Sequence, residues 1–314
     1  MTNTISAEHF VAPFNEDEDV ITVDALDETA KSLGFWGEAW ARLKRNPLFY
    51  IPTAFLIVLL VAVFFPSIFT AIDPTYCAIT DSSLPVGAPG HLLGTTTQGC
   101  DVFSRLVYGA QPSLQIGIIV TLLGAFFGVI IGTVAGYMGG ILDAILTRLI
   151  EIFISLPSML SFIVFLQMMK GVPGVFKLIF IFSVFGWMSI ARLMRANVMA
   201  AKNQEFVTSA KALGLSNFGR MFQHVLPNSI APVIAVATMN VGAWIVLEAS
   251  ISYLGLGLGG NSASWGMDIS NATNTMIVAP GMLFFPCLVL VLTSLTFILL
   301  GDALQDAIDP KARR

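Results

Sequence analysis

The stretch KALGLSNFGRMFQHVLPN, Lys211 to Asn228, is the most informative part of this sequence for its fold and its function. It is polar and partly charged, yet it lies between long apolar runs. Gly214 suits the end of a first short helix, since glycine adopts positive φ at low cost. Ser216 can cap a second short helix that ends at Leu226-Pro227. The pattern predicts two short helices joined by a glycine turn, which a soluble partner protein can bind. The alternative is a solvated loop without a binding role.

The composition around this stretch is that of a membrane protein. The chain is 55% hydrophobic, with a mean hydropathy of +0.80 and 24 phenylalanines. Only 11% of its residues are charged, against about 25% in an ordinary soluble domain. A water-soluble core of this size cannot bury so much apolar surface, so the composition indicates an integral membrane protein. The net charge of −4 and the lack of a strongly basic segment argue against nucleic acid as a partner.

The N-terminal segment differs from the rest. Residues 1–34 are rich in acidic side chains, as in NEDEDVITVDALDE, and predict a disordered arm. No basic start followed by an apolar core marks a secretory signal, so we expect this arm to stay in the cytoplasm. Residues 35–47 predict an amphipathic helix at the membrane interface, in contact with lipid. Its aromatic and basic side chains are Phe35, Trp36, Trp40, Arg42, Lys44 and Arg45.

Residues 48–314 predict one all-α membrane domain with six spans of roughly 20 mainly apolar residues each. The expected spans are Phe49–Phe69, Leu114–Tyr137, Leu146–Met168, Phe176–Leu193, Ile230–Tyr253 and Met276–Leu300.

The distribution of Lys and Arg predicts the orientation of these spans. With the N-terminus inside, Arg105, Lys170 and Lys177 fall outside, and the other 13 of the 16 Lys and Arg fall inside. Cytoplasmic segments carry the excess of positive charge, so both termini are expected in the cytoplasm. An outer loop then covers about residues 70–113, and a cytoplasmic loop with the opening stretch covers about 194–229.

Catalytic motifs are missing from the sequence. It has no phosphate-binding loop of the G-x-x-x-x-G-K-[ST] type and no hydrolase or metalloprotease motif. Its three histidines and three cysteines show no metal-ligand spacing. We therefore expect no catalytic residue, no metal site and no cofactor held by this chain.

Four further residues raise questions that the sequence leaves open. Glu151 and Glu248 lie in spans, where a charge is costly; they either line a translocation path or pair within the bundle, Glu151 with Arg148 for instance. Cys77 and Cys100 both fall in the outer loop, where they either form a disulfide or stay unpaired, because spacing alone does not determine geometry.

The opening stretch resembles the permease motif of binding-protein-dependent ABC importers. That motif reads E-A-A, three residues, G, nine residues, then I-x-L-P. Here Thr208-Ser209-Ala210 take the place of the triplet, Gly214 follows, and His224 to Pro227 close the motif at the same spacing. Thr208 replaces the glutamate, with Glu205 one turn earlier, and His224 replaces the isoleucine.

A second segment, HLLGTTTQGCDVFSRLVYGAQPSLQIG (His91–Gly117), is similar to C-type permeases of oligopeptide, dipeptide and nickel importers. Their pattern reads G-T-D-x-x-G-R-D-V-x-S-R-L-x-Y-G-A-R-x-S-L. Thr96, Cys100 and Gln111 replace its aspartate and two arginines, and Cys100 appears alongside the additional Cys77. The resemblance covers about residues 39–314.

The resemblance implies a non-catalytic permease subunit of an ABC importer in the bacterial inner membrane. Its expected partners are a second, homologous permease chain in a heterodimer, two cytoplasmic ATPases that bind ATP and Mg²⁺, and an external binding protein. The expected substrates are di- or oligopeptides, with nickel or another small solute as the alternative. The residues expected to couple to an ATPase are Glu205, Phe206, Thr208, Ser209, Ala210, Lys211, Gly214, Leu226 and Pro227. A self-contained ion-coupled secondary transporter, starting from Glu248, is the alternative of a different class.

Overall fold

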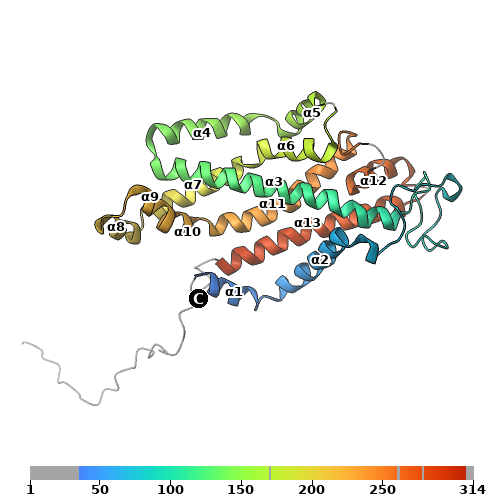
Figure 1. The fold of residues 1–314 in the computed structure, drawn as a ribbon, viewed down its shortest axis with the longest axis horizontal. Coiled ribbons are helices and arrows are strands. Elements are labelled where there is room, and N and C mark those ends of the chain that lie inside the picture. Colours follow the sequence, from blue (N-terminus) through green and yellow to red (C-terminus); the bar gives the residue numbers. More distant parts are fainter. Residues whose placement is uncertain (1–34, 170, 260–261, 278, 309–314) are drawn as a thin grey trace, which may run out of the picture.

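The computed structural model describes residues 35–169, 171–259, 262–277 and 279–308, so the predicted acidic arm at 1–34 lies outside the described residues. Long helices run side by side along the molecule (Figure 1). The described part of the chain has no strand, only three isolated β-bridges.

The helices, in chain order, are α1 (Phe35–Leu43), α2 (Pro47–Phe64), the 3₁₀ turns η1 (Pro66–Ile68) and η2 (Ile79–Asp81), α3 (Val102–Met138), α4 (Gly140–Ser155), α5 (Ser158–Met168), α6 (Gly174–Gly186), α7 (Met188–Lys202), α8 (Glu205–Ala212), α9 (Asn217–Arg220), the π-helical turn η3 (Met221–Val225), α10 (Leu226–Ser229), α11 (Ala231–Tyr253), α12 (Trp265–Ala272), the 3₁₀ turn η4 (Thr273–Thr275) and α13 (Gly281–Ile308).

The predicted class, a polytopic all-α membrane protein, is confirmed. Five helical stretches in the described residues are long and apolar enough to cross a membrane: α2, α3, α6 with α7, α11 and α13. The pair α4 and α5 makes a sixth if it counts as one span.

The third predicted span, Leu146–Met168, is not one straight helix. It consists of α4 and α5, which meet at an angle of 84°. Pro157 causes the break, because it lacks an N–H and disfavours helical backbone in the residue before it. Leu156 accordingly has extended backbone, at φ −75° and ψ 130°.

Helices extend into both predicted loops, and the short helices expected in the cytoplasmic loop are present. The outer loop, expected over about 70–113, ends at Asp101, whose carboxylate accepts the Ser104 N–H and caps α3. Hydropathy missed the first turns of α3 because they carry buried polar side chains, including Arg105 and Ser113. The cytoplasmic loop, expected over about 194–229, is largely helical, since α7 continues to Lys202.

Helix α3 packs closely against α6 and α7 through a row of glycines. Gly124, Gly128, Gly132 and Gly136 repeat every four residues and therefore share one face. An added Cβ would lie 2.8 Å from the Trp187 carbonyl oxygen at Gly128 and 2.7 Å from that of Arg195 at Gly136. Small residues on one face let two membrane helices approach to backbone contact.

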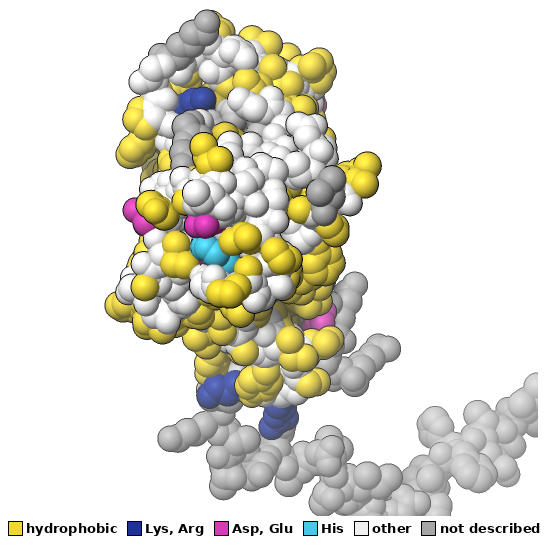
Figure 2. Space-filling view, turned by 90° about the vertical axis from the view of Figure 1, so that its right-hand side faces the viewer, with side chains coloured by type: hydrophobic (Ala, Val, Ile, Leu, Met, Phe, Trp, Pro, Cys, Tyr) yellow, Lys and Arg dark blue, Asp and Glu magenta, His cyan; other side chains and the backbone are white. Residues whose placement is uncertain are grey.

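The bundle has two unlike ends (Figure 1). Helices α1, α8 and α9 and the end of α13 lie at one end, and the segment after α2 lies with α12 at the other. The predicted interfacial helix is α1, which ends at Leu43 rather than at residue 47; its Ala39 and Leu43 pack against Ala303 and Ala307 of α13. The face at the α12 end carries mainly hydrophobic and other uncharged side chains (Figure 2).

A disulfide joins Cys77 and Cys100 in the segment that precedes α3. The two residues also form an antiparallel backbone bridge. Cys100 is buried, so the bond ties the segment after α2 to the start of α3.

Leucine in place of Gly128 should destabilise the bundle, since its side chain would push α3 away from Trp187 and Ile190. We expect a loss of about 1–3 kcal/mol in the free energy of unfolding, measured by thermal unfolding in detergent. Ala144→Leu on the exposed side of α4 adds comparable volume and should leave unfolding unchanged. Equal stability of both variants would contradict tight α3–α7 packing.

Labelling with a membrane-impermeant maleimide on intact cells tests the disulfide and its side of the membrane together. Cys77, which is partly exposed, should become reactive only after addition of reductant, whereas the buried Cys100 should stay unreactive. Reaction of Cys77 without reductant would show that no bond exists, and no reaction in either condition would contradict an outer location.

Candidate functional site

The candidate site is a helical elbow, Glu205–Ser229, that includes the opening stretch. Its first helix, α8, ends in a Schellman motif: Gly214 N–H donates to the Lys211 carbonyl (3.1 Å), and Leu215 N–H donates to the Ala210 carbonyl (3.2 Å). Gly214 has φ +85°, as its predicted role as a helix end requires. The turn between the two short helices is thus held by backbone hydrogen bonds.

The second part of the elbow begins as predicted and ends differently. Ser216 caps α9 by accepting the Gly219 N–H at 3.2 Å. The helix does not stop at Leu226-Pro227, however, but continues through η3 and α10 toward α11. Leu226 N–H bonds five residues back to the Met221 carbonyl. This wider turn directly precedes Pro227, whose missing N–H and ring it accommodates within the helical run.

The elbow is packed firmly onto the bundle. Val207, Met221 and Val225 are buried in one apolar cluster with Val198 of α7 and Tyr137 of α3. A rigid-body displacement of the elbow is therefore transmitted directly to two spans.

The structure exposes most of the predicted coupling residues but not all of them. Glu205, Phe206, Thr208, Ser209, Lys211, Gly214 and Pro227 are exposed, and Leu226 is partly buried. Ala210 was predicted to be a contact residue, yet it is only 4% exposed and faces its own chain. It lies on the same side of α8 as Val207, three residues earlier, which explains its burial.

Three exposed apolar side chains of the elbow are not among the predicted coupling residues. Leu213 is 81% exposed, and Phe218 and Phe222 are also well exposed. Large apolar side chains grouped on a surface are typical of a protein-binding site. Their grouping depends on the turn at Gly214 and is not visible in hydropathy.

Glu248 does not line an open passage in this structure. It is fully buried between α3 and α11, where the hydroxyls of Ser113 (3.0 Å) and Ser252 (2.7 Å) donate to its carboxylate. The Ser264 hydroxyl is a third hydrogen-bond partner. These contacts fit the alternative of pairing within the bundle, and the path-lining role stays a prediction.

Glu151 pairs with Arg148 on α4 at 2.7 Å, as one of the two alternatives proposed. Both side chains are nevertheless exposed, at 49% and 80%. A second ion pair, not predicted from the sequence, holds α4 to the bundle: Arg195 of α7 donates to both carboxylate oxygens of Asp143 (2.5 and 2.7 Å).

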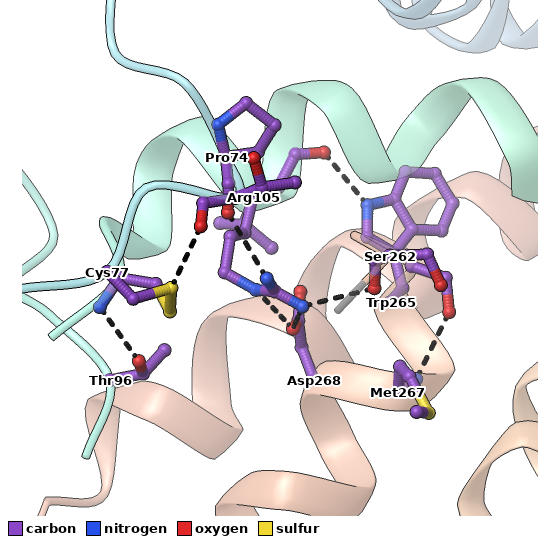
Figure 3. Close-up of polar contacts among 12 residues, drawn as sticks. Pro74, Cys77, Thr96, Arg105, Ser262, Trp265, Met267 and Asp268 are labelled. Atoms are coloured by element: carbon purple, nitrogen blue, oxygen red, sulfur yellow. Dashed lines mark hydrogen bonds and ion pairs between the residues drawn. A yellow bond between two sulfur atoms is a disulfide. The ribbon is translucent and has the colours of Figure 1, made fainter. Parts of the chain in front are cut away.

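At the opposite end, α12 is anchored to α3. Arg105 Nε donates to Asp268 at 2.6 Å, and its other nitrogens reach the carbonyls of Pro74 and Ser262, both at 3.2 Å (Figure 3). The Trp265 indole donates to the Leu106 carbonyl at 2.9 Å. Burial raises the pKa of Asp268 to about 6, although Arg105 opposes this rise. Asp268 is therefore ionised and paired with Arg105 at neutral pH.

Among the described residues, no group of three or more His, Cys, Asp or Glu side chains lies together as a metal site. The geometry instead combines several apolar spans with a rigid, exposed elbow at one end. This combination defines a polytopic membrane protein with a surface that a partner can reach.

The chain belongs to the family of binding-protein-dependent transport system inner membrane components, whose family model matches residues 128–314. The model for the N-terminal transmembrane domain of oligopeptide transport permease C matches residues 34–85. The resemblance found in the motifs is thereby confirmed. The protein is a multi-pass permease subunit of ABC importers in the inner membrane, and a self-contained secondary transporter does not fit this family.

Three relatives show the extent of the similarity. The dipeptide transport system permease protein DppC of Bacillus subtilis is 37% identical and is matched over 90% of this chain and 88% of its own. The oligopeptide permease protein OppC of the same organism is 32% identical, over 93% and 94%. The glutathione transport system permease protein GsiD of Salmonella typhimurium is 35% identical, over 88% and 91%.

One solved structure shares the fold. It is described as an amino acid ABC transporter with histidines, and it aligns with a TM-score of 0.51 at 15% identity. The alignment covers 63% of this chain and 91% of that chain.

Removal of one member of the Arg105–Asp268 pair should destabilise the protein strongly, because a buried charge is left unpaired. We expect Arg105→Gln to cost about 3–5 kcal/mol in thermal unfolding. Since the pKa of Asp268 lies above that of an unfolded aspartate, the native state binds the proton more tightly. At pH 5, below this pKa, the Asp268 carboxyl is mostly protonated, so removal of Arg105 leaves no buried charge unpaired. The cost of Arg105→Gln should therefore be smaller at pH 5 than at pH 8.

The double variant Arg105→Gln/Asp268→Asn is the control. It should be less destabilised than the sum of its single variants and should show no such pH difference. Additive losses would contradict direct pairing.

Proposed function

We propose that the chain is the C-type permease subunit of an ABC importer that translocates di- or oligopeptides delivered by an external binding protein. The names of the dipeptide and oligopeptide permease relatives support this substrate class. The second half of the pore would be a homologous but distinct permease chain. Two cytoplasmic ATPases would bind ATP and Mg²⁺ and hydrolyse the nucleotide. This chain would remain non-catalytic, with both termini in the cytoplasm.

The observation that carries this proposal is the elbow, which is exposed on one side and packed into the bundle on the other. Glu205, Ser209 and Leu213 point away from the chain, whereas Val207 and Met221 join the cluster with α3 and α7. An ATPase bound to the outer side would move the elbow as ATP closes the ATPase pair. The packed side would pass this motion to the spans and change the side to which the pore opens.

The pair Arg148–Glu151 is our candidate for the translocation path. Both side chains are exposed on α4, which belongs to the bent membrane segment. A charged pair facing hydrocarbon is costly, so such groups usually face a cavity or a partner. We place this side of α4 toward the path shared with the second permease chain.

Substitution of Gly214 tests the coupling role. A Cβ at this position meets no atom within 4 Å, so only the backbone conformation at φ +85° constrains the residue. Gly214→Val should distort the turn, since a β-branched residue is strongly disfavoured there. We expect normal membrane insertion, persistent ATP hydrolysis and peptide uptake reduced at least tenfold in proteoliposomes.

Gly214→Asn is the matched control. Asparagine tolerates this left-handed conformation, so uptake should stay close to that of the wild type. Full uptake by Gly214→Val, at equal protein level, would count against the elbow as the coupling element.

A further inference from the structure

A cavity of about 550 Å³ opens between α8, α9 and the last residues of α3 and α7. We call it the basic cavity, because three of its lining side chains are cationic and none is a carboxylate. The cations are Lys202, Lys211 and Arg220. A concentration of one sign of charge in a concave site attracts a ligand of the opposite sign.

The three cations have no counter-ion in the described part of the chain. None of them belongs to its four ion pairs. Lys202 donates to the Tyr137 carbonyl at 2.5 Å, and Arg220 donates to the Asn217 side chain. The Nε of Arg220 is buried without a hydrogen-bond partner. A buried donor without an acceptor is costly, and the three cations around the cavity favour an anion with acceptor oxygens as its ligand.

Thr208 is an uncharged neighbour of Lys211 in the cavity. It lines the cavity and lies three residues before Lys211 on α8. Residues three apart on a helix are neighbours, so Thr208 and Lys211 lie side by side. A glutamate here would neutralise part of the cavity, whereas threonine leaves its positive charge uncompensated.

We propose that the basic cavity receives a carboxylate side chain of the docked ATPase, which forms ion pairs with Lys211 and Arg220. This inference rests on the proposed function and specifies the chemistry of its interface. Its position supports a protein partner: α3 contributes only its last two residues, Tyr137 and Met138, and α7 only its last residue, so the cavity begins where these spans end.

The side chains around the cavity fit a protein interface as well. Phe218 lines the cavity and is 61% exposed, and Leu213 on the adjoining turn is exposed more fully. Apolar side chains around an ion pair exclude water once a partner binds, which strengthens the pair. The elbow therefore offers a positive centre with an apolar edge.

The test uses the whole transporter in nanodiscs of neutral phosphatidylcholine and measures the dissociation constant of its ATPase subunits at low and high salt. Lys211→Ala/Arg220→Ala should weaken ATPase binding about tenfold or more at low salt. The difference should shrink at high salt, because salt screens partly exposed pairs. Arg45→Ala, an exposed cation of the segment between α1 and α2, should bind like the wild type.

Thr208→Glu and Thr208→Gln form a second, matched pair. The glutamate adds a carboxylate beside Lys211 and should compete with the partner's carboxylate, so that ATPase binding weakens several-fold. The glutamine has nearly the same shape without the charge and should bind more tightly than the glutamate variant. This comparison does not depend on removing any side chain that supports the fold.

Three results would overturn the inference. Equal ATPase affinity of the wild type, the double alanine variant and Thr208→Glu would exclude a carboxylate in the cavity while leaving the proposed function intact. In parallel nanodiscs that contain phosphatidylglycerol, loss of this bound lipid from the double variant, with unchanged ATPase affinity, would assign the cavity to a lipid phosphate. Failure of the wild-type transporter to retain any ATPase would refute both this inference and the proposed function.

Discussion

The close approach of α3 to α7 is the contact on which the rest of the molecule depends. It exists because Gly124, Gly128, Gly132 and Gly136 present no side chain to the helix opposite. Lipid does not drive membrane helices together as water does, so such backbone contact supplies much of the attraction. The ends of these two helices then form a base for the elbow, whose Val207 and Val225 join the same apolar cluster.

The two ends of the bundle are held by different forces. At the elbow end, apolar packing and a Schellman turn make a rigid projection with an exposed outer side. At the other end, buried polar groups dominate: Arg105 pairs with Asp268, and Glu248 is surrounded by serine hydroxyls. Both networks join α12 to the bundle. The permease thus has a firmly anchored α12 and an elbow that a partner can reach.

Much of the fold follows from composition and spacing. Apolar runs predicted the spans, Gly214 and Ser216 predicted the turn and cap, and Cys77 with Cys100 predicted a possible bridge. Hydropathy failed where polar residues are buried in pairs, as at the start of α3, because it assigns Arg105 to a loop. It also failed at Pro157, where a span long enough by composition is bent by a missing N–H.

The candidate site, like the fold, could be predicted only in part from the sequence. The motif spacing located the elbow, but only three-dimensional packing separates Ala210, which faces inward, from Ser209, which faces outward. The basic cavity combines α3, α7, α8 and α9, and its three cations come from three different parts of the folded chain: the end of α7, α8 and α9. Such a site becomes visible only when the Gly214 turn brings the two short helices together.

Photo-crosslinking from the elbow of the assembled transporter tests the central claim most directly. A photoreactive side chain at Ser209, on the outward side of α8, should form adducts with the ATPase subunit. The same group at Tyr76, which is exposed in the segment between α2 and α3, should form none. No ATPase adduct from Ser209, or an ATPase adduct from Tyr76, would contradict the account of how this permease is driven.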